Sequence, residues 1–190
     1  MMGIDLDRIL ITGAGGMVGG YVDFGIKTNR SQLDVTNFEQ IVRFIKNCHP
    51  QAIIHLATET NLEICEQKPE RAYSINSVGT YNIAMAAKMV AAKMVYVSTD
   101  AIFSNSKNPH DVKDKPRPES IYGHSKYLGE LAVKGLSDNY IIARTSWVFG
   151  GGKKRDKKFV GKFTPQLNNT EAKAVNDQIN SPTYAKDLVK

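Results

Sequence analysis

The chain is poor in cysteine and has no long apolar run. Its 190 residues include two cysteines, Cys48 and Cys65, which do not form a CxxC pair. This usage favours neither a disulfide framework nor a zinc site, so we expect no metal. No stretch approaches the roughly 18 consecutive apolar residues of a membrane span, and the first residues lack the apolar core of a secretory signal. We expect a soluble, cytoplasmic protein with no membrane partner.

Acidic residues are the minority among the charged ones. The chain has 25 basic and 19 acidic residues, and five of the basic side chains fall in one cluster between Lys153 and Lys158. A basic balance suits an anionic partner. Because the alternating aromatic and basic pattern of an RNA-binding sheet is absent, we expect phosphate groups of a small molecule and no nucleic acid.

Short apolar runs alternate with segments of helical periodicity. The runs that read as buried parallel strands are 8–13, 51–57, 92–100 and 140–147. The helical segments are 37–49, 69–90 and one that begins near Tyr122, the first with Thr36 and Asn37 as candidate caps. This order predicts an α/β fold, a Rossmann-like doubly wound parallel sheet with helices on both faces.

Two segments depart from that regular alternation. Only thirteen residues separate Gly19 from Leu33, so we expect a very short first helix and a stubby strand within 24–28. After residue 150 the pattern changes to a glycine-rich loop, a basic helix, a further strand at 172–177 and the start of a last helix at 181–190. We therefore divide the chain into a dinucleotide-binding domain, 1–150, and the start of an incomplete substrate-binding part, 151–190.

The stretch GAGGMVGG, residues 13–20, follows the first predicted strand and precedes a helix. Glycines in this position let the backbone approach a pyrophosphate. The spacing Gly13, Gly16, Gly19 differs from the tighter GxGxxG pattern. A dinucleotide fold usually reads the adenine ribose about 20 residues further on, with an acid for a free hydroxyl and an arginine for a phosphate. Arg30 precedes Asp34 there, so we expect NADP(H) to be preferred and NAD(H) to be the alternative.

The stretch SIYGHSK places Tyr122 and Lys126 four residues apart. On a helix such residues share one face, so a phenol and an ammonium would lie side by side. A neighbouring cation favours the phenolate and lowers the pKa of a tyrosine, which would make Tyr122 a proton donor usable near neutrality. Taken alone, the pair is more typical of a solvated helix face.

Several motifs occur in one order along the chain. Besides the glycine block, they are LDVTN (33–37), the segment 53–84, MVYVSTDAIF (94–103), YGHSKYLGE (122–130), RTSWVFG (144–150) and NDQINSPTYAKDL (176–188). Together they resemble the extended short-chain dehydrogenases/reductases, and within them the dTDP-4-dehydrorhamnose reductase-like branch of nucleotide-sugar reductases. The resemblance covers nearly the whole chain. It implies an NAD(P)H-dependent reduction of a 4-keto-6-deoxy nucleotide sugar, in deoxysugar and polysaccharide biosynthesis.

The resemblance also implies roles for individual residues. Tyr122 would give a proton to the substrate carbonyl oxygen, Lys126 would bind the nicotinamide ribose, and Thr99 would hold the carbonyl oxygen. Trp147 would face the sugar. With the glycine turn and the ribose-reading residues, the expected cofactor contacts are Gly13, Gly16, Met17, Val18, Gly19, Arg30, Asp34, Val35, Leu56, Ala57, Thr58, Asn76, Ser98, Tyr122 and Lys126.

The sequence also departs from the resembled pattern. Ala101 stands where a tyrosine commonly lines the sugar site, and Asn105 and Ser106 replace a usual Asp-Gly pair. Members of this branch continue for roughly a hundred further residues. We therefore expect either that this chain is a fragment or that a partner chain, such as a second copy in a homodimer, completes the substrate pocket. Two alternatives stay open, a nucleotide-sugar epimerase or dehydratase that retains NAD, and a regulatory subunit that binds NADP without catalysis.

Overall fold

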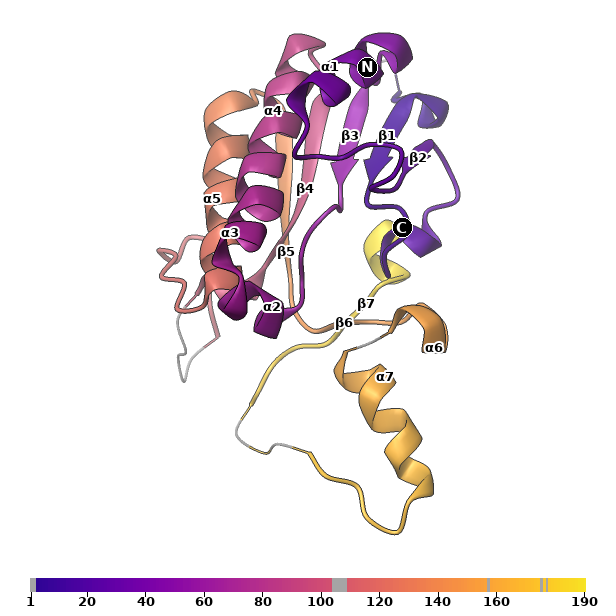
Figure 1. Ribbon diagram of the computed structural model, residues 1–190, viewed down its shortest axis with the longest axis vertical. Helices are drawn as coiled ribbons and strands as arrows, with labels where there is room; N and C mark the ends of the chain where they lie inside the picture. Colours follow the sequence, from indigo (N-terminus) through magenta and orange to yellow (C-terminus); the bar gives the residue numbers. More distant parts are fainter. Residues whose placement is uncertain (1–2, 104–108, 157, 175, 177) are drawn as a thin grey trace.

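A five-stranded parallel sheet forms the centre of the molecule (Figure 1). The computed structural model describes residues 3–103, 109–156, 158–174, 176 and 178–190. The strands are β1 (Ile9–Thr12), β2 (Ile26–Thr28), β3 (Ala52–His55), β4 (Lys93–Thr99) and β5 (Tyr140–Thr145). Their order across the sheet is β2-β1-β3-β4-β5, and every neighbouring pair is parallel. The predicted strands and the parallel sheet are therefore confirmed.

Helices connect the strands and pack along one face of the sheet. They are α1 (Phe38–Cys48), α2 (Leu62–Gln67), α3 (Pro69–Ala72), α4 (Gly79–Met89) and α5 (Ile121–Leu136). Figure 1 shows α1, α4 and α5 side by side against this face. The predicted helix over 69–90 is interrupted by a π-helical turn at Tyr73–Val78, and α2 precedes it as an element that the sequence did not predict.

The ends of the helices follow from local chemistry. The Asn37 side chain accepts a hydrogen bond from the backbone N–H of Gln40 and so caps α1, as predicted. At the other end of α1, His49 takes a left-handed conformation with φ of 42°. The Ser120 side chain caps α5 through the N–H of Gly123, which fixes where the helix carrying Tyr122 begins.

The two faces of the sheet are covered very differently. Leu10, Ile53 and Met94 are fully buried in the larger apolar cluster, together with residues of α1, α4 and α5. On the opposite face Ile9 and Ile11 pack with Val22 and, near the end of the chain, Val189. The first crossover contributes only a 3-10 turn, Gly19–Tyr21, so the predicted very short first helix is confirmed and leaves this face with short covering segments.

After β5 the chain forms small elements beyond the carboxyl ends of the strands (Figure 1). These are β6 (Val148–Phe149) paired with β7 (Thr183–Tyr184), helices α6 (Gly152–Arg155) and α7 (Phe159–Phe163), and 3-10 turns at Thr164–Asn168 and Asp187–Val189. The β6-β7 pair was not predicted. The strand expected at 172–177 is wrong for residues 172–174 and 176, whereas Val175 and Asp177 lie outside the described residues. The last helix is reduced to β7 and one 3-10 turn.

Within the described part of the chain, no helix is both long enough and apolar enough to cross a membrane.

Candidate functional site

The carboxyl ends of four parallel strands meet at one edge of the sheet. Gly13 follows β1, Leu56 follows β3, Asp100 follows β4 and Ser146 follows β5. In open α/β sheets ligands bind outside this edge. Most of the predicted site residues are on these four loops or on the first turns of the helices that follow.

The glycine turn after β1 packs tightly against the loop after β3. Gly13 has a φ of 70°, and a Cβ atom there would lie 2.6 Å from the backbone nitrogen of Ala57. A Cβ atom at Gly19 would lie 2.5 Å from the Cα of Ala14. Backbone atoms therefore exclude a side chain at both positions. At Gly13 these atoms belong to Leu56 and Ala57, so the turn and the loop after β3 are in direct contact. A shared cofactor site, as predicted, requires this contact.

The outer side of this turn carries unused donors. The backbone N–H groups of Gly15, Met17 and Val18 have no acceptor among the described residues, whereas Gly16 donates to the Gly13 carbonyl. Space around the Cβ position of Gly15 is open. A concave turn with several free N–H groups is suited to a phosphate group.

A buried polar network lies directly beneath the turn. The His55 ring contacts the Thr12 hydroxyl through Nδ1 at 2.7 Å and the Thr80 hydroxyl through Nε2 at 3.1 Å. Because Thr80 donates its hydrogen to the Asn76 carbonyl, it accepts from Nε2–H, and Nδ1 accepts from Thr12. Burial, with a smaller contribution from the Lys126 charge, lowers the pKa of His55 to about 3, so the ring is neutral.

The expected ribose-reading residues lie just after β2. Arg30 is exposed, and its Nε atom is 3.6 Å from the carboxylate of Asp34. Hydrogen bonds from the backbone N–H and hydroxyl of Thr36 lower the pKa of Asp34, and Arg30 adds to this shift. Val35 is buried, with its carbonyl held by the Asn82 side chain. The pair places a cation and an anion beside each other just after β2, where the sequence analysis expects an adenine ribose to be read.

Thr99 and Tyr122 meet at the end of β4. The Thr99 hydroxyl donates to Asp100 at 3.2 Å and accepts from the N–H of Ala101 at 3.2 Å. Burial raises the pKa of Tyr122 to about 12, and a hydrogen bond with Thr99 opposes that shift. The expectation that a neighbouring cation lowers the pKa of Tyr122 is therefore wrong for this structure, because removal of the phenol from water is the larger effect.

Lys126 points inward and not along the helix surface. Its Nζ atom donates to the carbonyl of Val97 at 2.8 Å and lies 4.1 Å from the centroid of the Tyr96 ring. Burial lowers the pKa of Lys126 to about 7, and the charge of Glu130 opposes the shift. The i, i+4 spacing correctly predicted that Tyr122 and Lys126 share one face of the helix. The position of the ammonium, however, is determined by the Tyr96 ring and the Val97 carbonyl.

Asn76 links the loop after β3 to helix α5. Its side-chain oxygen accepts from the Thr58 hydroxyl at 2.9 Å and the N–H of Glu59 at 2.8 Å. Its side-chain nitrogen donates to the Ser125 hydroxyl at 3.0 Å. Asn76 is completely buried, so it joins the loop after β3 to α5 from inside the fold. Its expected contact with a cofactor stays a prediction. Ser98 is also buried, and its carbonyl accepts from the hydroxyl of Thr145 at 3.1 Å.

The residues after β5 form the outer wall of the site. Trp147 has a φ of 39°, an uncommon conformation for a large side chain, and its ring lies 5.5 Å from that of Phe159. Lys158 donates to the carbonyl of Thr60 at 2.6 Å, which attaches α7 to the loop after β3. Arg155 packs over Gly20, beside the glycine turn. Of the basic cluster, Lys157 lies outside the described residues, as do the departures Asn105 and Ser106.

One group near Thr99 was missed from the sequence. The carboxylate of Asp100 accepts from the hydroxyl of Ser146 and from the side-chain amide of Asn180, each at 2.8 Å. Asp100 lies in the motif STD, Ser146 in RTSW and Asn180 in NSP, so each residue belongs to a motif that the sequence analysis had noted. Their contact joins positions 80 residues apart, which spacing alone cannot reveal.

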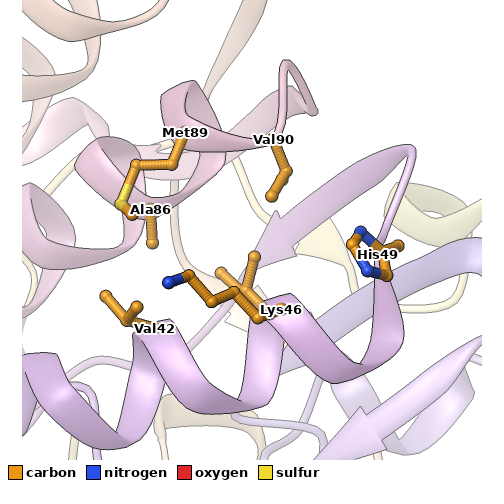
Figure 2. A pocket seen from close by; sticks show the side chains of 7 residues that line it. Val42, Lys46, His49, Ala86, Met89 and Val90 are labelled. Carbon is orange, nitrogen blue, oxygen red and sulfur yellow. The ribbon is translucent and has the colours of Figure 1, made fainter.

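Two cavities are present besides this group of residues. One of about 240 Å³ between α1 and α4 is mainly apolar, and Figure 2 shows the Lys46 amine directed across it. The other, of about 420 Å³, is lined by Arg117, Pro118, Glu119 and His124. Neither contains a predicted catalytic residue. Among the described residues, no group of three or more His, Cys, Asp or Glu side chains is arranged to hold a metal ion.

Comparison with known proteins gives one consistent result. The family model described as RmlD substrate binding domain matches residues 7–190. The chain is 36% identical to a dTDP-4-dehydrorhamnose reductase of Mycolicibacterium smegmatis over 96% of its own length, and spans 58% of that protein. It is 30% identical to the spore coat polysaccharide biosynthesis protein SpsK of Bacillus subtilis, of which it spans 68%.

Solved structures agree with these matches. The crystal structure of a dTDP-4-dehydrorhamnose reductase from Bacillus anthracis in complex with NADP superposes with a TM-score of 0.90 at 36% identity. The match covers 99% of this chain and 70% of that one. A UDP-glucose 4-epimerase from Thermotoga maritima superposes with a TM-score of 0.83 at 21% identity, which shows a common fold.

Proposed function

The chain belongs to the RmlD substrate-binding domain family, and from this we propose that it is the cofactor-binding and catalytic part of an NADP(H)-dependent reductase of a 4-keto-6-deoxy nucleotide sugar. The observation that carries this proposal is the placement of Thr99 at the end of β4 and of Tyr122 in the first turn of α5, at the sheet edge that also holds the glycine turn. A proton donor thus lies at the same edge as free backbone donors suited to a pyrophosphate.

The residues present fit a dinucleotide. The free N–H groups of Gly15, Met17 and Val18 would receive its pyrophosphate, and the tight contact of Gly13 with Ala57 holds the turn against the loop after β3. Leu56, Ala57 and Thr58 would line its path, and Gly16 and Gly19 would complete the turn. When bound, the nicotinamide supplies a hydride to the substrate carbonyl carbon.

Arg30 favours NADP(H) over NAD(H) in this proposal. Its guanidinium is exposed and only loosely paired with Asp34, at 3.6 Å, so it is free to turn towards a 2'-phosphate. The relative from Bacillus anthracis was crystallised with NADP. An NAD-specific site would instead present an unpaired carboxylate to the ribose hydroxyls.

Tyr122 is the residue that we assign to proton transfer. With its pKa at about 12 in this state, the phenol is protonated throughout the neutral range and can donate to a carbonyl oxygen as negative charge develops on it. Thr99 lies beside it, and when substrate binds its hydroxyl would turn from Asp100 to that oxygen and supply a second hydrogen bond. The two hydroxyls together would stabilise the developing alkoxide.

Lys126 supplies a nearby cation whose charge changes near neutrality. Its pKa of about 7 follows from burial, so a small change in surroundings alters the charged fraction. In the proposed enzyme Lys126 would leave the Val97 carbonyl to bind the ribose, and its ammonium would then favour the phenolate left on Tyr122.

The substrate side of the site is formed by Trp147 and the segment after it. The indole, held in its unusual conformation and stacked on Phe159, would contact the sugar ring. Ala101 leaves this wall without a tyrosine, so the identity of the sugar is a matter for experiment.

We also propose a boundary near residue 150 between the cofactor-binding and substrate-binding parts. We further propose that the protein is cytoplasmic and forms a homodimer.

The test compares the chain with its Tyr122→Phe variant in reducing dTDP-4-keto-6-deoxyhexose with NADPH. We expect a loss of turnover of about 10²- to 10⁴-fold in the variant, with cofactor binding retained. Tyr140→Phe, an exposed tyrosine at the start of β5, is the matched control and should keep full activity. A regulatory subunit would be indifferent to Tyr122→Phe. An epimerase would convert the sugar without net oxidation of NADPH.

A further inference from the structure

The carboxylate of Asp100 occupies a junction between three segments. It follows β4 directly and accepts hydrogen bonds from Thr99 on β4, Ser146 after β5 and Asn180 in the segment leading to β7. Its Oδ1 atom receives the Thr99 hydroxyl, and its Oδ2 atom receives the other two donors. A carboxylate with three donors is a strong and well-oriented acceptor.

This arrangement determines the direction of the Thr99 hydroxyl. A threonine has one hydroxyl hydrogen, and Thr99 gives it to Asp100. One lone pair of the same oxygen accepts from the N–H of Ala101. The remaining lone pair is available to the phenol of Tyr122, which lies near enough to Thr99 to interact with it.

Ser146 and Asn180 in turn fix Asp100. The Ser146 hydroxyl and the Asn180 amide nitrogen converge on the same carboxylate oxygen. Ser146 has one hydroxyl hydrogen, so when it donates to Asp100 it makes no hydrogen bond to the Asn180 side-chain oxygen beside it. The Asn180 side-chain oxygen is held by the N–H of Ser181, which leaves its amide nitrogen directed at Asp100. Among the described residues, neither the Ser146 side chain nor the Asn180 side chain bonds to Thr99 or Tyr122, and the carboxylate is the side-chain link between them. Ser146 is also next to Thr145, which pairs with Thr99 in the sheet, so Asn180 is the cleaner position for a test.

We propose that Asp100 is a positioning residue that sets the direction of the Thr99 hydroxyl, and that Asn180 and Ser146 couple the segment after β5 to the Thr99–Tyr122 pair through it. The proposal rests on the proposed function for its catalytic meaning, because Thr99 and Tyr122 are the assigned catalytic pair. The placement of residue 180 then controls whether the hydroxyl pair is ordered. The nearby negative charge also disfavours ionisation of Tyr122 and keeps it in its acid form.

The test is a double-mutant cycle between Asp100→Asn and Asn180→Ala in the whole chain, observed by NMR of labelled threonine methyl and tyrosine ring groups. Signals of Thr99 and Tyr122 are assigned from Thr99→Ser and Tyr122→Phe spectra. We expect Asn180→Ala to shift both signals although it contacts neither residue. In the Asp100→Asn background the same change should shift neither of them further.

Controls separate this coupling from a general loss of structure. Asn169→Ala, an exposed asparagine in the same segment, and Asp5→Asn, a carboxylate at the far end of the sheet, should leave both signals in place. Thermal unfolding checks that each variant is folded. Should Asp100→Asn fail to fold, Ser146→Ala replaces it, since it removes a different donor to the same oxygen. Equal shifts from Asn180→Ala in both backgrounds, or no shift in either, would overturn the proposal.

Steady-state kinetics give a second test, because a residue with a purely structural role would not lower kcat while leaving KM for NADPH unchanged. We expect Asn180→Ala and Asp100→Asn each to lower kcat about 10- to 100-fold with KM for NADPH unchanged, and the double variant to match the single ones. Multiplied losses in the double variant would contradict the coupling. NADPH binding is followed in the same samples. A wild-type chain that binds no cofactor would contradict the proposed function, whereas the NMR cycle would still test the junction.

Discussion

The chain up to β5 and the segment after residue 150 are ordered in different ways. The first part places Leu10, Ile53 and Met94 in a common core that helices cover, and its polar network around His55 is fully enclosed. Among the described residues after 150, only Asp156 and Ala185 are buried. This segment owes its position to contacts with the sheet part, such as Lys158 to Thr60. The reacting groups thus lie on a self-supporting framework, and the proposed substrate wall depends on that framework.

The largest loss of stability is expected when a buried charge is removed from the sheet part, and this tests the contrast with the segment after residue 150 most strongly. Glu130 on α5 is completely buried and forms two hydrogen bonds with Arg144 of β5, at 2.8 and 3.0 Å. Glu130→Ala leaves the guanidinium with the Val112 carbonyl but without a carboxylate, and should lower the free energy of unfolding by about 3–5 kcal/mol in urea titrations. Glu39→Ala, an exposed acid of α1, is the control. A loss below about 1 kcal/mol would show that the pair does not support the framework.

A core truncation in the sheet tests the same point without charge. Leu10 on β1 is inaccessible to solvent and packs between neighbouring strands and helices. Leu10→Ala removes buried methyl groups and leaves a cavity, so we expect a loss of about 2–5 kcal/mol in unfolding free energy. If urea unfolding of this variant matched that of the parent chain, the described core would not be the source of stability.

The buried imidazole predicts an acid limit for the sheet part. The pKa of His55 is about 3 in the folded chain, against about 6.5 when unfolded, so the unfolded state binds more protons between these values. The stability is fully present above about pH 6.5 and is lost as pH falls towards 3. Urea unfolding from pH 7 to 4.5 should show a steeper loss for the parent chain than for His55→Gln. The exposed His49→Gln variant should keep the parent slope, and equal slopes in all three would be contrary to this account.

The smallest effect is expected in the last segment. Leu167 is 64% exposed and lies in the 3-10 turn after α7. Leu167→Ala should change the unfolding free energy by no more than about 0.5 kcal/mol, because little of the apolar surface of Leu167 is buried in the folded chain. A change comparable with that of Leu10→Ala would mean that the segment after residue 150 has a core of its own and would remove the contrast.

The sequence predicted the sheet part better than the segment that follows it. Continuous apolar runs and flanking glycines predicted β1, β3, β4 and β5, since burial on both faces leaves a clear local pattern. The two-residue β6-β7 pair has no such pattern and depends on contacts between distant positions. The motifs marked Thr99, Tyr122 and Lys126, but the inward direction of Lys126 depends on the Val97 carbonyl and the Tyr96 ring, which only the folded chain brings near it.

The central claim is that the determinants of cofactor binding lie in the sheet part of this chain, before residue 130. The most direct measurement is a titration of the purified chain with NADPH and with NADH, followed by nicotinamide fluorescence. The account predicts saturable binding of NADPH with a Kd below about 1 mM, weaker binding of NADH, and unchanged NADPH binding in Leu167→Ala. A folded chain that binds neither dinucleotide at millimolar concentration would contradict it.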